Sequence, residues 1–407
     1  MLLYLALKID NVGYRMREAV IVDAIRTPIA RGKFGPGELS GLHAAHLLQS
    51  VQGALCERNN LAKSDVEQVI GGCVTQAGEQ SNNIVRHAWL ASGDDYTAGG
   101  TTIDTQCGSG QQANHLVHAL VKSGSIDVGI ACGVEVMSHV GLGANVINGP
   151  GFFQPEDWPW DTAMDQFTMA ERIAENRGLS RKDVDAFGLA SQVKAAAARD
   201  DGRFNKEILA IKAPAIGEDG QPTGETLEVT QDQGIRESTP EGLADLKPII
   251  EGGMHTPGNS SQISDGAAAV LYMTRERAEQ LGLQPRARIL FDVLCGTDPY
   301  YLLDGPVDAT RVIEKKSGMS IRNDIDLYEV NEAFAAVVLS WAGVYDIDMD
   351  KVNTNGGAIA LGHPVGATGS RLIVTALHEL ERQGLGTAFI SMCCGAAVGT
   401  GTIIERL

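Results

Sequence analysis

Residues 104–114 read D-T-Q-C-G-S-G-Q-Q-A-N and place a cysteine, Cys107, in a turn of small residues that opens into a predicted helix. A second such turn, S-M-C-C-G-A-A-V-G-T-G, covers residues 391–401 and contains Cys393. Backbone N–H groups and the positive end of a helix dipole can reach a thiol in such a turn, and both favour a thiolate or a developing oxyanion. The two turns therefore indicate acyl transfer on sulfur.

Around these turns, short apolar segments of strand length alternate with segments of helical periodicity. We predict strands at 19–22, 69–70 and 128–132, and helices at 42–61 and 113–121. Strands that alternate with helices are typical of parallel sheets covered by helices on their faces. The sequence therefore predicts the α/β class.

A chain of 407 residues is too long for one small core, so we expect two domains. Residues from about 143 to 245 break the strand–helix alternation with amphipathic runs at 163–177 and 182–199, followed by a polar segment. We interpret them as a loop domain inserted into the first α/β unit. The predicted domains are then 16–284, which includes the insertion, and 285–407.

Two segments look like a distant internal duplication. Cys107 begins a Gly-rich turn, a helix and a strand that ends near Cys132, while His363 begins a Gly-rich turn, a helix and a strand that ends near Cys393. The spacings are similar but unequal. If the halves pack as twins, the helix N-termini that carry Cys107 and His363 converge on one crevice.

The charge balance excludes some partners. Acidic residues outnumber basic ones by 51 to 33, giving a net charge of −18, which argues against a nucleic-acid-binding surface or an anionic membrane surface. No apolar run reaches the length of a membrane span. An anionic ligand would need a local basic patch.

Seven cysteines without the spacing of a secreted scaffold indicate reduced thiols, so we expect a cytoplasmic protein. The opening M-L-L-Y-L-A-L-K lacks the basic region and cleavage site of a secretory signal. A strand pattern starts after Met16, which suggests an alternative start and leaves residues 1–15 as an extension without an interpretation.

Two further motifs lie between the cysteine turns: N-E-A-F at 331–334 and G-G-A-I-A-L-G-H-P-V-G-A-T-G-S-R at 356–371. With them, the chain from residue 17 to 407 resembles the thiolase superfamily. Residues 68–83 and 299–307 look like those of bacterial 3-ketoacyl-CoA thiolases that degrade steroid side chains. The resemblance implies a five-layered α-β-α-β-α fold made of two similar halves. It also implies a homodimer or homotetramer, with coenzyme A as a substrate and no metal or permanent cofactor.

By this resemblance Cys107 is the nucleophile and Cys393 is the general acid and base. Taken alone, Cys107 would be interpreted as a buried small hydrophobic residue, the usual environment of an unpaired cysteine, but residues 108–110 and the other motifs favour the nucleophile. Adjacent side chains point in opposite directions on an extended chain, so only one of Cys393 and Cys394 should face the cleft. A metal or a disulfide at that pair is the alternative.

His363 is expected to donate a hydrogen bond to the substrate thioester oxygen and to support the Cys107 thiolate. Asn331 would hold a water that joins His363 in a first oxyanion hole. The N–H groups of Cys107 and Gly395 would form the second hole. Glu332 is expected to support the loop.

For the coenzyme, G-N-S-S-Q-I-S-D-G-A-A-A at 258–269 matches the loop along pantetheine, with Ser261 at the contact position. Arg236 matches an arginine near the nucleotide phosphates, although an exposed arginine is often only a solvated charge. Phe334 would line the acyl pocket or pack. Thiolases usually carry three glycines where this chain has Gly395, Ala396 and Ala397.

We therefore predict an acyltransferase that cleaves a 3-ketoacyl-CoA with coenzyme A into acetyl-CoA, or propionyl-CoA, and a shortened acyl-CoA. The pathway would be fatty-acid or steroid side-chain β-oxidation. A biosynthetic acetoacetyl-CoA thiolase is the first alternative, but residues 165–171, D-Q-F-T-M-A-E, lack the His-Met-Gly of that type. The others are a ketoacyl synthase that uses a carrier protein and a silent acyl-CoA-binding protein.

Overall fold

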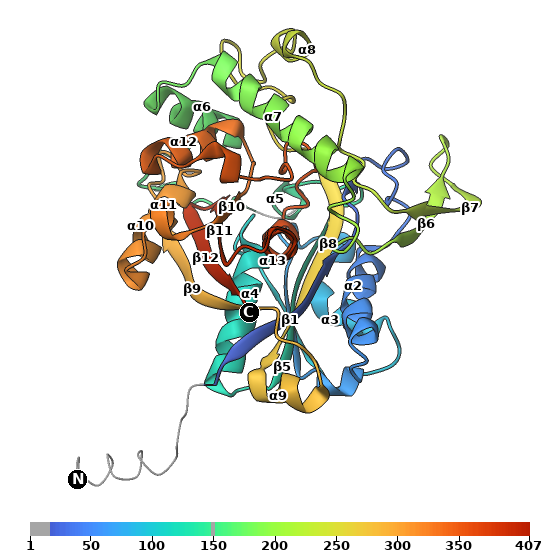
Figure 1. Ribbon diagram of the computed structural model, residues 1–407. Helices are drawn as coiled ribbons and strands as arrows, with labels where there is room; N and C mark the ends of the chain where they lie inside the picture. Colours follow the sequence, from blue (N-terminus) through green and yellow to red (C-terminus); the bar gives the residue numbers. More distant parts are fainter. Residues whose placement is uncertain (1–16, 148–150) are drawn as a thin grey trace.

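The computed structural model describes residues 17–147 and 151–407. The predicted extension at 1–15 and the alternative start at Met16 lie outside these residues. Within the described chain, the fold is built around one large mixed sheet with helices on both faces (Figure 1). The sheet consists of two halves that are joined where Ile21 pairs with Ala287.

The N-terminal half of the sheet contains parallel and antiparallel pairs. Its order is β1 (Ala19–Arg26), β8 (Ser264–Thr274), β5 (Val128–Val136), β3 (Gln68–Gly72) and β4 (Gly99–Ile103), and the short β2 (Ala30–Arg31) also pairs with β8. β3 is parallel to β4 and β5, whereas β8 is antiparallel to β5 and β1. The predicted strands are present, but the sheet is mixed where parallel sheets were expected, because β8 returns from the long insertion in the opposite direction.

The C-terminal half repeats this arrangement. Its order is β9 (Ala287–Gly296), β12 (Val398–Arg406), β11 (Thr387–Cys394) and β10 (Leu327–Val330). β10 is parallel to β11, and β12 is antiparallel to both β11 and β9. β12 thus corresponds to β8, and β11 corresponds to β5.

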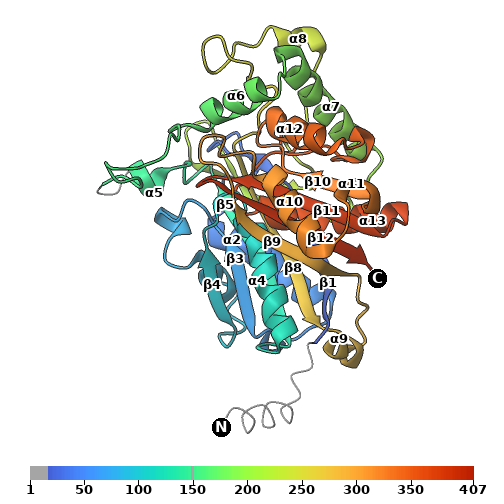
Figure 2. The same cartoon turned by 90° about the vertical axis from the view of Figure 1, so that its left-hand side faces the viewer.

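Helices complete five layers, which run from left to right in Figure 1, and Figure 2 views them from the side of the C-terminal half. The outer helices of the N-terminal half are α2 (Ala44–Arg58) and α3 (Ile84–Leu90), those of the C-terminal half are α10 (Gly305–Ser317) and α12 (Ala335–Tyr345), and the middle layer is α4 (Ser109–Ser123) and α13 (Thr368–Gln383). A separate buried apolar cluster fills each of the outer interfaces, and a third surrounds the middle helices. The predicted five-layered fold is confirmed.

The middle helices show the expected duplication. Cys107 precedes α4 and β5, and His363 precedes α13 and β11. The two helices start side by side: Asn114 Nδ2 donates to Ser370 Oγ at 3.0 Å, and a Cβ atom on Gly110 would lie 2.8 Å from the Ser370 nitrogen. Glycine at position 110 is therefore required for this close approach, which brings both helix N-termini to one place.

The insertion between β5 and β8 is richer than predicted. It contains α5 (Ala144–Ile147), α6 (Gln166–Asn176), α7 (Arg181–Asp200), the hairpin of β6 (Ile211–Ile216) and β7 (Pro222–Val229), and α8 (Pro240–Ala244). The two predicted amphipathic helices are α6 and α7. The polar segment after them forms the hairpin that projects from the molecule in Figure 1. The sequence did not predict this hairpin, because β7 is almost fully exposed and has no alternating apolar pattern.

Short elements connect the rest. They are α9 (Arg275–Leu281), α11 (Ile321–Asp324) and the 3-10 segments Lys63–Asp65, Gly78–Gln80 and Met349–Lys351.

Candidate active site

Cys107 lies in a tightly fixed turn between β4 and α4. The Asp104 Oδ1 atom accepts the Gln106 N–H at 2.7 Å, and Ser109 Oγ accepts the Thr105 N–H at 2.8 Å. Gln106 adopts a left-handed conformation, with φ of 51°. Cys107 itself is 5% exposed. Local hydrogen bonds thus hold the predicted nucleophile at the start of α4.

Burial keeps the Cys107 thiol protonated at neutral pH. It raises the pKa of Cys107 to about 11, although the N–H groups of Gly395 and of Cys107 itself act in the opposite direction. The sequence-based expectation that the turn favours a thiolate is therefore only half right, since desolvation outweighs the N–H groups. A base must remove the proton before Cys107 can attack.

Cys393 and Cys394, at the end of β11, point in opposite directions as expected. A Cβ atom on Gly108 would lie 2.6 Å from Cys394 Sγ, so Cys394 faces the turn that precedes α4. Cys393 instead packs among apolar side chains of the insertion and of α12. Burial raises the pKa of Cys393 well above its usual value, and the nearby charge of Cys107 raises it further. The two predicted thiols thus lie close enough to interact electrostatically.

Cys393 and Cys394 do not form a disulfide. All seven cysteines are free thiols. Within residues 17–147 and 151–407, no group of three histidine, cysteine or acidic side chains is placed to hold a metal ion.

His363 follows Gly362, whose backbone conformation and close packing only glycine allows. Gly362 has φ of 118°, and a Cβ atom there would lie 2.3 Å from Ser264 Oγ. The backbone N–H of His363 donates to Gln262 O at 3.1 Å. The imidazole is 4% exposed, so its position and its surroundings are fixed by the fold.

Hydrogen bonds define the tautomer of His363. The Thr368 hydroxyl donates to Pro364 O at 3.0 Å and lies 2.7 Å from His363 Nδ1. Its single hydrogen is committed to the carbonyl, so Nδ1 is the protonated ring nitrogen. Burial, reinforced by the charge of Arg371, lowers the pKa of His363 to about 3. Nε2 therefore carries a lone pair that can accept a proton or a hydrogen bond.

Asn331 follows β10 and adjoins that nitrogen. Its Nδ2 atom lies 3.3 Å from His363 Nε2 and donates to it. Its Oδ1 atom is buried and has no hydrogen-bond partner among the described residues. Asn331 Oδ1 is thus open to a water molecule, but His363 Nε2 can donate to an oxyanion only after it has taken up a proton.

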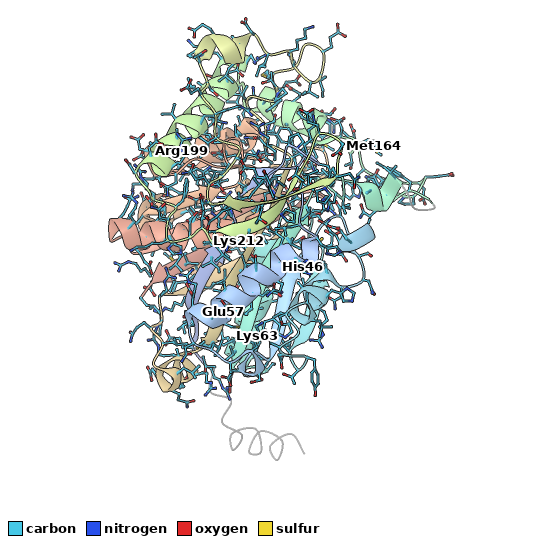
Figure 3. All side chains as sticks on the ribbon, turned by 90° about the vertical axis from the view of Figure 1, so that its right-hand side faces the viewer. His46, Glu57, Lys63, Met164, Arg199 and Lys212 are labelled. Atoms are coloured by element: carbon cyan, nitrogen blue, oxygen red, sulfur yellow. The ribbon has the colours of Figure 1, made fainter. Side chains whose placement is uncertain are left out.

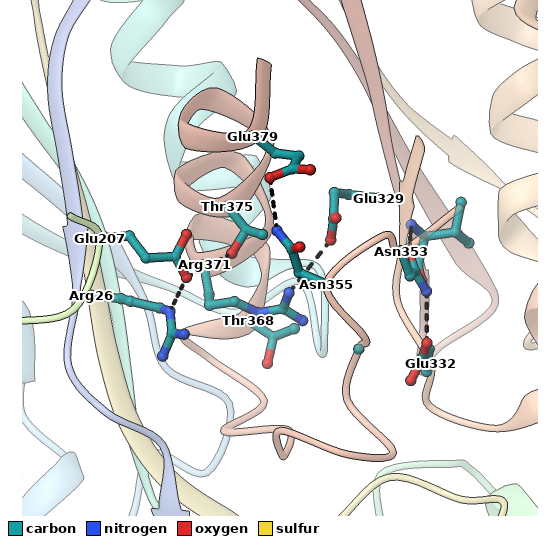
Figure 4. A network of polar contacts seen from close by, with 12 residues as sticks. Arg26, Glu207, Glu329, Glu332, Asn353, Asn355, Thr368, Arg371, Thr375 and Glu379 are labelled. Carbon is teal, nitrogen blue, oxygen red and sulfur yellow. Dashed lines mark hydrogen bonds and ion pairs between the residues drawn. The ribbon is translucent and has the colours of Figure 1, made fainter. Parts of the chain in front are cut away.

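Glu332 supports the loop, as predicted. Its carboxylate accepts hydrogen bonds from Ser191 Oγ at 2.6 Å, Asn353 Nδ2 at 2.9 Å and the Ile359 N–H at 3.1 Å. Figure 4 shows Glu332 beside Asn353. This fully buried carboxylate joins the N-E-A-F segment to α7 and to the segment that leads to His363.

A buried ion pair that the sequence did not reveal lies behind His363. Arg371, in the first turns of α13, and Glu329, in β10, approach to 3.6 Å with their side chains 2% and 0% exposed (Figure 4). Burial raises the pKa of Glu329 to about 8, and Arg371 opposes that rise. The only signal in the sequence was the arginine that ends the 356–371 motif.

The predicted coenzyme residues lie in two loops, one before and one after α8, and Arg236 contacts the second. The Ser261 N–H donates to Ala333 O at 2.9 Å, and Arg236 Nη2 donates to Pro257 O at 3.3 Å. Arg31, which the sequence analysis missed, lies close enough that its charge, after burial, lowers the pKa of Arg236. No carboxylate among the described residues forms an ion pair with either arginine.

Phe334 packs. It is 5% exposed, and its ring meets those of Phe167 and His255 edge-on at centroid distances of 5.0 and 5.5 Å. It does not line the large cavity described next. Of the two expectations for Phe334, the geometry matches packing.

A cavity of about 730 Å³ opens beside the two cysteine turns. Asp104, Gln106 and residues 395–397 line it on the side of the turns, and the insertion lines the other side with Phe153, Trp158, Trp160 and Met164, among others. These four side chains are between 42% and 64% exposed. Figure 3 labels Met164 near the projecting α5 segment.

Two residues of the cavity wall have an unusual backbone. Ala396 and Ala397 have φ of 60° and 54°, in the left-handed region that glycine adopts without strain. The methyl groups that replace the expected glycines therefore lie in the wall of the cavity, on a strained turn next to Gly395.

Comparison with known proteins agrees with this architecture. The family model of the thiolase N-terminal domain matches residues 19–276, and that of the thiolase C-terminal domain matches residues 283–406. The fold and these matches define an acyltransferase. The chain belongs to the thiolase family.

Individual relatives cover nearly the whole chain. A steroid 3-ketoacyl-CoA thiolase of Mycobacterium tuberculosis, FadA6, is 41% identical over 97% of this chain and 96% of its own. A 3-ketoacyl-CoA thiolase of Idiomarina loihiensis is 38% identical over 96% and 100%. An acetyl-CoA acetyltransferase of Chromobacterium violaceum is 40% identical over 96% and 100%.

Among solved structures, the acetyl-CoA acetyltransferase of Bacillus anthracis matches with a TM-score of 0.87 and 33% identity, over 97% of this chain and 100% of that one. None of the helices in the described residues is both long and apolar enough to cross a membrane.

Proposed function

We propose that this thiolase cleaves 3-ketoacyl-CoA thioesters that carry a bulky, apolar acyl group, with coenzyme A as the acceptor. The cavity of about 730 Å³ beside Gly395 is the observation that carries the proposal. Pockets of about 300–1,000 Å³ hold drug-sized ligands. An acetyl group would leave most of this space unfilled, whereas a ring system could contact Trp158 and Trp160. The name of the mycobacterial relative supports a steroid-derived acyl group.

In the first half-reaction, His363 Nε2 takes the proton of the Cys107 thiol. The sulfur attacks the 3-keto carbon, and the N–H groups of Cys107 and Gly395 stabilise the resulting oxyanion. Such preorganised donors are worth about 3–4 kcal/mol each. The bond between C2 and C3 then breaks, and its electron pair forms the enolate of acetyl-CoA. Asn331, through a water, and protonated His363 donate to the enolate oxygen, while Cys393 donates its proton to C2.

In the second half-reaction, the Cys393 thiolate takes the proton of the incoming coenzyme A thiol. The coenzyme sulfur attacks the acyl group on Cys107, and the second oxyanion hole stabilises the intermediate again. Cys107 leaves as a thiolate and recovers its proton from His363. Each group thus returns to its starting state, and the product is an acyl-CoA that is shorter by the released acetyl unit.

Coenzyme A would bind as a substrate along the loop of Ser261. Arg236 and Arg31 form a local positive patch in a chain whose net charge is −18, and this patch suits the nucleotide phosphates. Phe334 would support the pantetheine tip from behind by packing. No permanent cofactor enters the proposed mechanism.

We further propose the division into domains 16–284 and 285–407, with a loop domain at about 143–245, and a homodimer or homotetramer as the assembly. β4 is an edge strand of the described sheet and leads directly to Cys107. Pairing of two such edges would bury the open hydrogen-bonding groups and fix the turn. Seven free cysteines suit a reducing cytoplasm.

Mass spectrometry of the protein after exposure to substrate tests the assignment of the two thiols. Cys107→Ser should abolish both turnover and covalent acylation, whereas Cys393→Ser should retain an acyl group trapped on Cys107. Cys295→Ser, at a partly exposed thiol outside the site, serves as the matched control and should remain active. Turnover by the Cys107→Ser variant would refute the assignment.

The substrate range is tested by comparing acetoacetyl-CoA with a 3-ketoacyl-CoA that bears a ring system, followed by the loss of enolate absorbance. A higher kcat/KM with the bulky substrate supports the degradative role. Activity confined to acetoacetyl-CoA would favour the biosynthetic role, and acyl-CoA binding without turnover would indicate a silent protein.

A further inference from the structure

The wall of the acyl cavity contains polar side chains that the thiolysis mechanism does not use. Two of them follow neighbouring strands. Thr75 comes after β3, and Asp104 comes after β4. Because Gly72 pairs with Ile103 and the Cys73 N–H donates to Ile103 O at 3.2 Å, the two segments leave the sheet side by side. Both residues are part of the cavity lining.

Thr75 is fixed in place, but its hydroxyl is unused. Its N–H donates to Glu135 Oε1 at 3.0 Å, and its carbonyl accepts from Gln80 Nε2 at 2.9 Å. The residue is 1% exposed, and its Oγ1 atom has no hydrogen-bond partner among the described residues. Leaving a buried hydroxyl without a partner costs about 1–3 kcal/mol. A ligand in the cavity could remove that cost.

Asp104 offers a complementary acceptor. Its Oδ1 atom accepts from the Gln106 N–H at 2.7 Å and from Gln106 Nε2 at 3.3 Å. Its Oδ2 atom accepts only the long bond from Gln106 Nε2, also 3.3 Å. A carboxylate oxygen can accept two hydrogen bonds, so Oδ2 retains a free position. Asp104 lies three positions before Cys107, and Gln106 lies one position before it.

We propose that Thr75 and Asp104 form a polar subsite that recognises a hydroxyl group on the acyl chain of the substrate. A hydroxyl can donate to the Asp104 carboxylate and accept from the Thr75 hydroxyl at the same time, whereas a ketone could use only Thr75. The acyl group would then be largely apolar, because aromatic side chains line much of the cavity. Its hydroxyl would lie within about 10 Å of the thioester on Cys107, because Asp104 is three residues from Cys107 along the chain. This subsite rests on the proposed function, because it assumes that the cavity holds the acyl group.

The test compares 3-ketoacyl-CoA substrates that end in a methyl group with partners in which a hydroxyl replaces that methyl, over a series of chain lengths. The ratio of the two kcat/KM values should favour the hydroxylated substrate at one length. Thr75→Val, which has the same shape without the hydroxyl, and Asp104→Asn should each lower that ratio about tenfold, the value of one good hydrogen bond. Thr75→Ser keeps the hydroxyl and should keep the ratio.

Calorimetric binding of the matching acyl-CoA products separates the two proposals. If thiolysis is absent but the hydroxylated acyl-CoA still binds more tightly, and Thr75→Val removes that difference, the subsite stands and the proposed reaction fails. If the wild-type protein shows no preference for the hydroxyl at any length, or if both variants retain the preference, the subsite does not exist.

Discussion

His363 Nδ1 lies 2.7 Å from Thr368 Oγ1, and the same hydroxyl donates to Pro364 O at 3.0 Å. The two contacts fix the proton of the neutral imidazole on Nδ1 and leave Nε2 as the base. The orientation comes from the first turn of α13 and therefore from the fold itself. Thr368 acts through His363 and is a positioning residue.

Replacing Thr368 with valine should lower kcat about 10- to 100-fold, because the buried Nδ1–H loses its acceptor at a cost of about 1–3 kcal/mol and the wrong tautomer becomes accessible. Thr368→Ser retains the hydroxyl and should retain most of the activity. Thiolysis rates, with circular dichroism to confirm folding, measure the effect. Equal rates for the valine and serine variants would contradict this role.

Ala396→Gly and Ala397→Gly should each stabilise the protein by about 1 kcal/mol, because both alanines have a left-handed backbone. The loss of two methyl groups also enlarges the cavity, so KM for a bulky substrate should fall in the double variant. Ala197→Gly, in the exposed face of α7, is the matched control and should destabilise by about 1 kcal/mol. Thermal denaturation measures all four variants, and a lower Tm in the double variant would count against strain.

Replacing Arg371 alone with methionine should destabilise the protein by about 3–5 kcal/mol, because it leaves Glu329 buried without its partner. Replacing both residues with methionine should cost clearly less than the sum of the single changes. Urea unfolding of the four members of this cycle measures the coupling. Additive effects would show that the pair does not interact.

Acid should weaken the fold partly through His115. Burial lowers its pKa from 6.5 to about 4 in the folded state, so the unfolded chain binds the proton first as the pH falls. The contribution of the neutral His115 to the free energy of unfolding is fully present above pH 6.5. It is lost progressively towards pH 4, and the total loss is about 3 kcal/mol.

The prediction is that His115→Gln flattens the dependence of the unfolding free energy on pH in that window. His46→Gln, on the exposed face of α2, is the control, and Figure 3 labels this histidine. Urea unfolding at several pH values measures the slope. An unchanged slope in His115→Gln would assign the acid sensitivity to other groups.

Much of the fold could be predicted from local patterns. The strands of the first half and the helices α6 and α7 follow from apolar periodicity, and the duplication follows from two similar turn–helix–strand segments. The antiparallel direction of β8 and the exposed hairpin β6–β7 could not be predicted. Strand direction depends on how a distant segment returns, and β7 has no buried face to produce an alternating pattern.

The same division applies to the site. Motifs located Cys107, His363, Asn331 and Cys393, because their chemistry requires particular residue types in particular turns. No motif marked Arg31 beside Arg236, the pairing of Arg371 with Glu329 or the unpartnered hydroxyl of Thr75. Each of these depends on contacts between segments that are distant in the chain or on the absence of such contacts.

The sequence by itself determined the family and the glycines that allow two helix N-termini to meet, and it predicted the reacting groups, because these are properties of residue type and local backbone. Only the tertiary structure decided that the Cys107 thiol rests protonated, that the His363 imidazole is neutral and that a large cavity lies beside the two cysteine turns. Desolvation, hydrogen-bond geometry and empty volume arise where separate segments pack together, and no single segment encodes them.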